Sequence, residues 1–385
     1  MIRFVRSCRD SLRCLQDLSN NPGIVFYSEG VSYAPYLAPV INALGALCDD
    51  KIYYLASDAS DPMLVDPPTH VKSYYIGKGN IQTYVLNHLS ARLLATTMPD
   101  IETFHIKRSP NVRHYAYLHH SMVSTHMVYR KGAFDHFDSI FCVGPHHDQE
   151  IREWETLKSL PAKQLIEHGH PPLDSLIAAA KANPAPIVQS ENRLNILLAP
   201  SWGPQGVMET QAEEIVEILL NAGHYVRVRP HPRTRQISGP VLDALAKKFM
   251  GNPDFDMSED TTRYEALLQS HIMISDWSGV AMEFAFGLER PVIFIDVPRK
   301  INNAEYAEIS TEPLEALYRE EVGRVIRPDQ STELPKILAS IQKDNPQFGD
   351  RMRELRARHI YNIGTSAEIG ARKLAELAVG SSTDS

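Results

Sequence analysis

The sequence contains no long hydrophobic run. No segment reaches the about 18 consecutive apolar residues that a membrane-spanning helix needs, and the N-terminus lacks the apolar core of a signal peptide. The four cysteines (Cys8, Cys14, Cys48 and Cys142) form no CxxC pair, so they predict neither a disulfide framework nor a zinc site. We therefore expect a cytoplasmic protein with reduced thiols, neither secreted nor integral to a membrane.

The sequence also lacks an excess of positive charge. Its formal net charge is −8 at pH 7, which argues against a general nucleic-acid binder, because such proteins hold phosphates with a surplus of Lys and Arg. The composition, 43% hydrophobic and 22% charged, is that of an ordinary globular protein, and 385 residues favour two domains. Any anion that the protein binds must be held by a local group of residues.

Short apolar runs alternate with helix-length patterns along the chain. Runs rich in β-branched or aromatic residues and bounded by Gly, Pro, Asp or Ser are typical of buried strands. They occupy residues 23–28, 51–57, 71–77, 93–98, 115–120, 139–144, 195–202, 225–232, 272–278 and 291–297. The alternation predicts an α/β protein with parallel sheets, made of two Rossmann-like domains that face a cleft.

A linker is predicted where prolines and a polar run interrupt this alternation, at residues 181–193. We expect an N-terminal domain at residues 1–180 and a C-terminal domain at residues 194–345. Helices at residues 346–385 would follow, with the option of packing back on the N-terminal domain.

The first segment of the chain mixes basic and apolar residues. Arg3, Arg6, Arg9 and Arg13 alternate there with Phe, Val and Leu. One interpretation is a first helix docked on the protein, and the other is a helix that lies on an anionic membrane.

Ligands of open parallel sheets bind beyond the carboxyl ends of the strands, so polar residues that follow an apolar run are candidate site residues. His119 and His120 end one such run, and Arg130 and Lys131 follow. A neutral imidazole at this edge can take a proton from an attacking hydroxyl, while the others can contact an acceptor or its phosphate. The alternatives are structural histidines, or a metal site shared with other histidines of this half.

A second candidate is the basic segment VRVRPHPRTR. Its Arg229 and His231 can neutralise a diphosphate and stabilise the charge of a leaving group. The alternative is a solvated basic edge strand.

The third candidate is a turn between a strand and a helix, SDWSG. Ser275, Asp276, Ser278 and Gly279 lie where the helix begins, and its free N–H groups can bind an anion. Glu283 follows one turn later, where it can accept hydrogen bonds from ribose hydroxyls. Simple capping of the helix is the alternative.

A fourth candidate is the loop APSWGPQG. Ser201 and Trp202 follow a strand there and suit a loop beneath a phosphate or a base, or equally a tight turn.

Taken in order, these motifs resemble the CDP-glycerol glycerophosphotransferase family of teichoic-acid and capsule polymerases and primases. The family's fold is GT-B-like, which implies an acceptor domain at residues 1–180 and a nucleotide-donor domain at residues 194–345. The family has a WHG-type motif followed by a Lys, a GxPRxD element, an RPHP motif and an SDxSS turn with a downstream acidic residue. The corresponding segments here are LHHS with Lys131, GHPPLD (169–174), RPHP (229–232) and SDWSG with Glu283. LHH replaces WHG, Pro172 replaces the Arg, and Gly279 replaces the second Ser.

The resemblance implies a transferase that moves glycerol phosphate, or a related polyol phosphate, from a CDP-linked donor to a hydroxyl of a cell-surface polymer or lipid-linked acceptor. His119 would remove the proton of the hydroxyl, while Arg229, His231 and the helix end at Ser278 stabilise the departing CMP. This scheme requires no cofactor, and no metal site is indicated. It would operate in the cytoplasm, at the inner face of the membrane. The alternatives are a GT-B glycosyltransferase, a nucleotide-sugar epimerase, or a catalytically silent scaffold.

Overall fold

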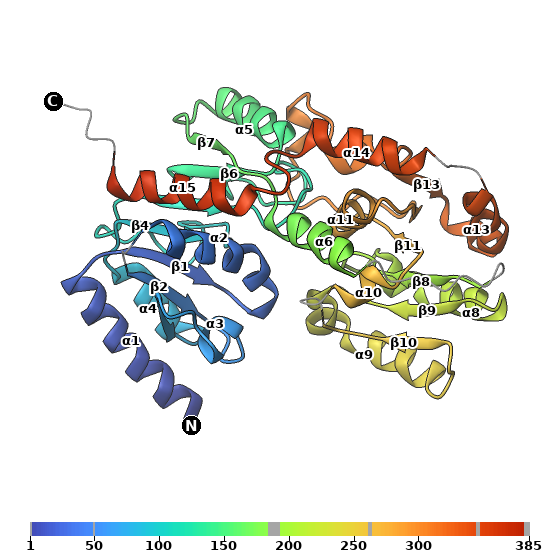
Figure 1. Cartoon of the computed structure of the whole chain (residues 1–385), viewed down its shortest axis with the longest axis horizontal. Helices are drawn as coiled ribbons and strands as arrows, with labels where there is room; N and C mark the ends of the chain where they lie inside the picture. The colour runs from blue at the N-terminus through green and yellow to red at the C-terminus, as the bar shows by residue number, and fades with distance from the viewer. Residues whose placement is uncertain (1, 49–50, 184–192, 261–263, 344–346, 381–385) are drawn as a thin grey trace.

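The structure is a computed structural model that describes residues 2–48, 51–183, 193–260, 264–343 and 347–380 (Figure 1). Two separate parallel sheets lie side by side in it, each with helices on both faces (Figure 1). Most of the predicted linker, residues 184–192, lies outside the described residues. The two-sheet α/β prediction is therefore confirmed, while the domain limits stay a prediction.

The first sheet has seven strands in the order β3-β2-β1-β4-β5-β6-β7. The strands are β1 (Ile24–Ser28), β2 (Ile52–Ala56), β3 (Val71–Tyr75), β4 (Leu93–Thr96), β5 (Tyr115–Leu118), β6 (Ser139–Cys142) and β7 (Gln164–Glu167). Its helices are α1 (Ile2–Asn20), α2 (Ala34–Leu47), α3 (Pro62–Val65), α4 (Asn80–His88), α5 (Pro145–Lys158) and α6 (Pro171–Ala182), with a short 3₁₀ helix η1 (Val31–Tyr33) before α2.

The second sheet has six strands in the order β10-β9-β8-β11-β12-β13. The strands are β8 (Asn195–Leu198), β9 (Tyr225–Val228), β10 (Phe255–Met257), β11 (Ile272–Ser275), β12 (Val292–Ile295) and β13 (Gly323–Ile326). The helices are α7 (Val207–Thr210), α8 (Ala212–Asn221), α9 (Pro232–Phe249), α10 (Glu265–Leu268), α11 (Gly279–Leu288), α12 (Leu314–Leu317), α13 (Leu334–Lys343), α14 (Phe348–His359) and α15 (Ser366–Val379), with 3₁₀ helices η2 (Tyr306–Glu308) and η3 (Pro328–Glu333).

All ten predicted strands form; β1 ends with its predicted run at Ser28, and the other nine end one to four residues before theirs. Three further strands, β7, β10 and β13, were not predicted. They lie at the edges of the sheets, and most of their residues are only partly buried. An edge strand needs no continuous apolar run, so it lacks the pattern that marks the buried strands.

The two halves share an apolar core. Met122 and Leu173 of the first half are buried together with Phe284 of α11 in the second. Helices α6 and α11 approach so closely that a Cβ atom on Gly287 would lie 2.7 Å from Leu176 Cδ2. This contact fixes the position of one sheet relative to the other.

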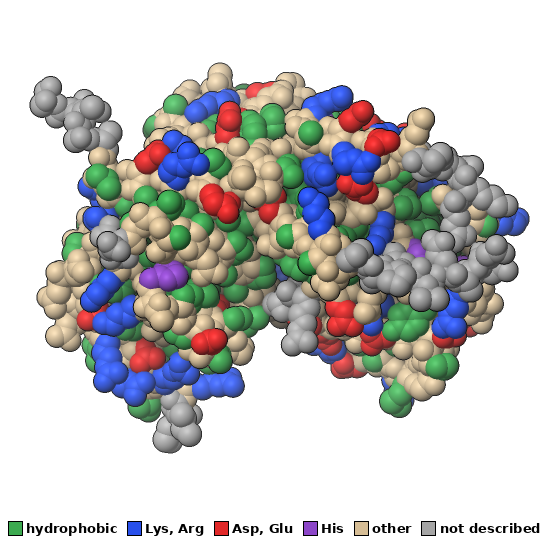
Figure 2. Space-filling model, viewed as in Figure 1, with side chains coloured by type: hydrophobic (Ala, Val, Ile, Leu, Met, Phe, Trp, Pro, Cys, Tyr) green, Lys and Arg blue, Asp and Glu red, His purple; other side chains and the backbone are tan. Residues whose placement is uncertain are grey.

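The C-terminal segment returns to the first half. Helix α14 packs on α11, and α15 crosses to pack on α2 (Figure 1). Asp174 of α6 accepts hydrogen bonds from the backbone N–H groups of Gly364 (2.7 Å) and Ser366 (3.1 Å), which hold the start of α15. Figure 2 shows a hollow between the two lobes at the lower edge of the view.

Candidate active site

The carboxyl ends of four neighbouring strands of the second sheet carry most of the predicted donor residues. Trp202 follows β8, His231 follows β9 and Ser278 follows β11, while Lys300, which was not predicted, follows β12. The strand order reverses between β8 and β11, which is the place where open α/β sheets bind ligands.

His231 is positioned by the start of α9. Its Nδ1 accepts a hydrogen bond from the Arg233 N–H (3.1 Å), so the neutral ring carries its proton on Nε2. Burial, together with the positive charges of Lys300 and Arg233, lowers the pKa of His231 to about 3. His231 is thus a neutral hydrogen-bond donor at physiological pH.

Two cations meet on the indole of Trp202. The Nζ of Lys300 lies 3.5 Å from the ring centroid and the guanidinium carbon of Arg233 lies 3.9 Å from it. Burial lowers the pKa of Lys300 to about 7 even though Asp276 favours its charged form. Two like charges on one aromatic ring, beside a neutral donor, favour the binding of an anion between them.

In the SDWSG turn, some polar groups are bonded within the protein and one hydroxyl makes no capping bond. Ser275 donates to the Ala199 carbonyl (2.8 Å), and Asp276 accepts from the N–H groups of Ser201 (2.6 Å) and Val207 (3.1 Å). Ser275, Asp276 and the Ser201 backbone therefore brace the loop after β8. Ser278 precedes α11 and makes no side-chain capping bond, so its hydroxyl is the group of this turn that is available to a ligand.

Glu283 faces the first half of the molecule. Its Oε1 lies 3.3 Å from Nε2 of His170, which belongs to the GHPPLD element and precedes α6. Arg229 is also buried here, and Glu283 favours its charged form. The pair with His170 ties the donor side to the N-terminal side of the site.

The two adjacent histidines after β5 have different surroundings. His119 is 2% exposed, its two ring nitrogens have no hydrogen-bond partner, and Phe134 and His147 flank its ring at 5.3 and 4.0 Å. His120 instead meets Tyr33 at 5.3 Å, and a positive charge on it disfavours protonation of His231. The two histidines thus have different neighbours, Tyr33 beside His120 and His147 beside His119, and the prediction that His119 is the proton acceptor stays a prediction.

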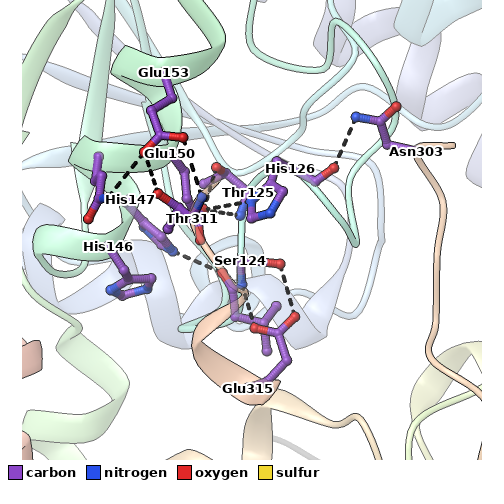
Figure 3. Close-up of polar contacts among 12 residues, drawn as sticks. Ser124, Thr125, His126, His146, His147, Glu150, Glu153, Asn303, Thr311 and Glu315 are labelled. Atoms are coloured by element: carbon purple, nitrogen blue, oxygen red, sulfur yellow. Dashed lines mark hydrogen bonds and ion pairs between the residues drawn. The ribbon is translucent and has the colours of Figure 1, made fainter. Parts of the chain in front are cut away.

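The loop after this histidine pair is held from both halves (Figure 3). Glu150 of α5 accepts from the N–H and hydroxyl of Thr125, both at 2.6 Å, and Glu315 of α12 accepts from those of Ser124, both at 2.9 Å. His147 donates to the Val123 carbonyl at 2.9 Å. Burial raises the pKa of Glu315 to about 7. These bonds fix the path of the chain beyond His120.

Two predicted acceptor contacts, Lys131 and Arg130, interact with residues that do not belong to the predicted site. Lys131 forms an ion pair with Glu305 (2.6 Å) on the exposed surface, and Arg130 lies over the ring of Phe104 at 5.0 Å. Sequence reasoning did not assign Tyr36, His170 or Lys300. Tyr36 lies 6.1 Å from His120 and 5.6 Å from His170.

Within the described residues, no group of three or more His, Cys, Asp or Glu side chains is arranged to hold a metal ion. The prediction that no cofactor is required stays a prediction. The site combines a neutral imidazole from each half of the molecule, His120 and His231, with the N-terminus of α11 and buried cations. Such groups suit the transfer of an anionic group from a diphosphate.

Comparisons with known proteins identify the family and the fold of the chain. Residues 122–368 match the family CDP-Glycerol:Poly(glycerophosphate) glycerophosphotransferase. No curated protein matches significantly. Among solved structures, the wall teichoic acid polymerase TagF is 14% identical with a TM-score of 0.63, covering 98% of this chain and 95% of TagF. The UDP-GlcNAc 2-epimerase of Neisseria meningitidis is 16% identical with a TM-score of 0.59, covering 92% of this chain and 99% of its own. At these identities the similarity of structure establishes the GT-B-like fold.

Proposed function

Because the chain belongs to the CDP-glycerol:poly(glycerophosphate) glycerophosphotransferase family, we propose that it transfers glycerol phosphate from CDP-glycerol to a hydroxyl group of a polymer acceptor. The family match carries this proposal, since it spans more than half of the chain and includes the RPHP and SDWSG segments. The finer proposal is that the acceptor is a cell-surface polymer or a lipid-linked primer with a free polyol hydroxyl.

In the proposed reaction, the acceptor oxygen attacks the β-phosphate of CDP-glycerol. The new O–P bond forms as the bond from the β-phosphorus to the bridging oxygen breaks, and CMP leaves. His120 takes the proton of the hydroxyl. It is neutral before the reaction, because burial lowers its pKa to about 4.

The donor side stabilises the charge of the leaving CMP. His231 donates from Nε2, Lys300 and Arg233 supply positive charge, and the N-terminus of α11 at Ser278 offers free N–H groups. All four groups are in place before the reaction, so little reorganisation is needed.

Release of CMP from CDP-glycerol tests the proposal. We expect release by the purified protein to increase at least about tenfold when a glycerol-phosphate-primed lipid or oligosaccharide is added, because in-line attack requires a positioned acceptor. The assay uses coupled detection of CMP, with CDP-ribitol, CDP-glucose and UDP-GlcNAc as matched donors. Release from a UDP-sugar but not from CDP-glycerol would move the function to a glycosyltransferase or epimerase.

We also propose that α1 makes peripheral contact with the cytoplasmic face of an anionic membrane. In the part of the chain that the structure describes, no helix combines the length and the apolar character needed to cross a membrane. Helix α1 packs on β3 and α4 by its buried side, while Phe4 (64% exposed) and Leu12 (69%) face outward. Figure 2 shows Lys and Arg side chains gathered at the lower left, where α1 lies in Figure 1.

Replacing Phe4 and Leu12 by Ser should reduce co-sedimentation with phosphatidylglycerol vesicles about tenfold, since two large apolar side chains no longer enter the bilayer interface. Vesicles of neutral phosphatidylcholine should bind the unaltered protein poorly. Leu317→Ser, which changes an exposed apolar residue of α12 (52% exposed), is the matched control. Equal binding by the α1 variant and the control would refute the contact.

A further inference from the structure

Glu29 lies at a place in the first sheet that corresponds to the donor site in the second. It directly follows β1, and the strand order of the first sheet reverses between β1 and β4. The carboxyl end of a strand at such a reversal is where α/β sheets bind ligands. The turn at Glu29 is open, since a Cβ atom on the next residue, Gly30, would meet no heavy atom within 4 Å.

The carboxylate of Glu29 is only partly exposed, and no hydrogen bond or ion pair to it exists among the described residues. Burial, together with the nearby charge of Asp100, raises its pKa to about 7. Asp61, near the same edge of the sheet, accepts hydrogen bonds from Ser28, Tyr54 and the Met63 N–H. Withdrawing a carboxylate from water without partners costs free energy, which a ligand with hydroxyl donors would offset.

The neighbours of Glu29 connect it to the reacting groups. Tyr33, one turn of chain later, lies 5.3 Å from His120, and the Glu29 charge raises the pKa of Tyr33. The positive charges of Arg233 on the donor side and of exposed Lys78 both favour the ionised form of Glu29. Glu29 therefore lies on the N-terminal wall, facing the donor site and close to the proposed base.

We propose that Glu29 is the acceptor-binding residue of the N-terminal half and that its carboxylate accepts a hydrogen bond from a hydroxyl of the polyol at the end of the acceptor chain. A carboxylate selects hydroxyl donors and disfavours a phosphate at the same point, so the uncharged end of the chain binds here. The exposed Lys78 would then bind the phosphate that is nearest to this uncharged end of the acceptor chain. This assignment rests on the proposed transferase function.

Glu29→Gln separates acceptor binding from donor binding. The amide keeps the size of the side chain but loses the charge that strengthens the bond to a hydroxyl. We expect the acceptor KM to rise about tenfold, with the KM for CDP-glycerol and the acceptor-independent release of CMP unchanged. Asp58→Asn, which changes a carboxylate near the same edge that is bonded to Ser60, is the matched control and should leave the three values unchanged.

An unchanged acceptor KM, or a rise in the donor KM alone, would overturn the assignment. The substitution should not lower the Tm, because it removes a carboxylate whose charged form is disfavoured by burial. If the unaltered protein does not use CDP-glycerol at all, the proposed function fails, and calorimetric titration with a short glycerol phosphate oligomer then tests Glu29 separately. Weaker binding by Glu29→Gln supports the assignment in that case, and equal binding overturns it.

Discussion

Replacing His120 by alanine is expected to lower kcat for acceptor-dependent CMP release by about 100- to 10,000-fold, the usual contribution of a general base. The acceptor hydroxyl would keep its proton during attack, because no other described imidazole of the N-terminal half is placed beside Tyr33 and Tyr36 in this way. Initial rates at saturating donor and acceptor measure the effect. The KM for CDP-glycerol should change little, since the donor residues lie on the second sheet.

The neighbouring histidine provides the comparison. His119→Phe keeps a ring in the aromatic surroundings formed by Tyr117, Tyr129 and Phe134, so it should retain activity within about tenfold. A large loss in His119→Phe with a normal rate in His120→Ala would restore the assignment made from the sequence. Circular dichroism of both variants establishes that each is folded.

The difference between these two histidines shows where sequence reasoning stops. The apolar run predicts a strand to residue 120, whereas the strand ends at Leu118, and polar residues beyond it are candidates for a site. Both histidine rings contact Tyr117 and Tyr129, but of the two it is His119 that packs on His147. This contact joins residues 28 positions apart in the sequence, so the local sequence pattern around His119 does not predict it.

Long-range contacts also decide which groups of the SDWSG turn are bonded within the protein. The motif predicts an anion site, and the helix does begin at Gly279. However, Asp276 is bonded to backbone groups of the loop after β8, about 70 residues earlier in the chain. Glu283 is paired with His170 across the boundary between the halves. Contacts over such separations come from the relative placement of two sheets, which the sequence pattern does not specify.

The sequence does contain a feature that marks Glu29 and Lys300, namely their position after predicted strands. Both follow apolar runs that were predicted as strands, as the four candidate segments do. A single charged residue after a strand is common on protein surfaces, so it stands out only when the fold shows that it is partly buried and near another sheet. The RPHP segment was recognisable because several basic residues are adjacent in it.

Acidification is expected to unfold the protein between about pH 4 and 5, because buried histidines are neutral in the folded state. Burial lowers the pKa of His168 to about 3 and that of His120 to about 4. The unfolded chain takes up protons below pH 6.5, whereas the folded chain does not, so stability is lost as the pH falls from 6.5 toward these values. Urea unfolding followed by Trp fluorescence at pH 7.5, 6, 5 and 4.5 measures the loss.

Two carboxyl groups act in the opposite direction. Burial raises the pKa of both Glu29 and Glu315 to about 7, so each becomes stabilising as the pH falls from 7 toward 4.5. They partly offset the histidines in that range, and below it only the loss remains. The free energy of unfolding should therefore change little between pH 7.5 and 6 and then fall steeply below pH 5.

His168→Gln isolates one of these contributions. Linkage for a group with a pKa of 6.5 unfolded and about 3 folded gives a loss of about 2 kcal/mol between pH 7.5 and pH 5. The free energy of unfolding should therefore fall by about 2 kcal/mol less in the variant than in the unaltered protein when the pH is lowered from 7.5 to 5. The comparison uses the difference and not the absolute values, because loss of the ring contact with Phe141 (5.3 Å) lowers stability at every pH. An equal difference in both proteins would mean that His168 is not among the groups that make the fold sensitive to acid.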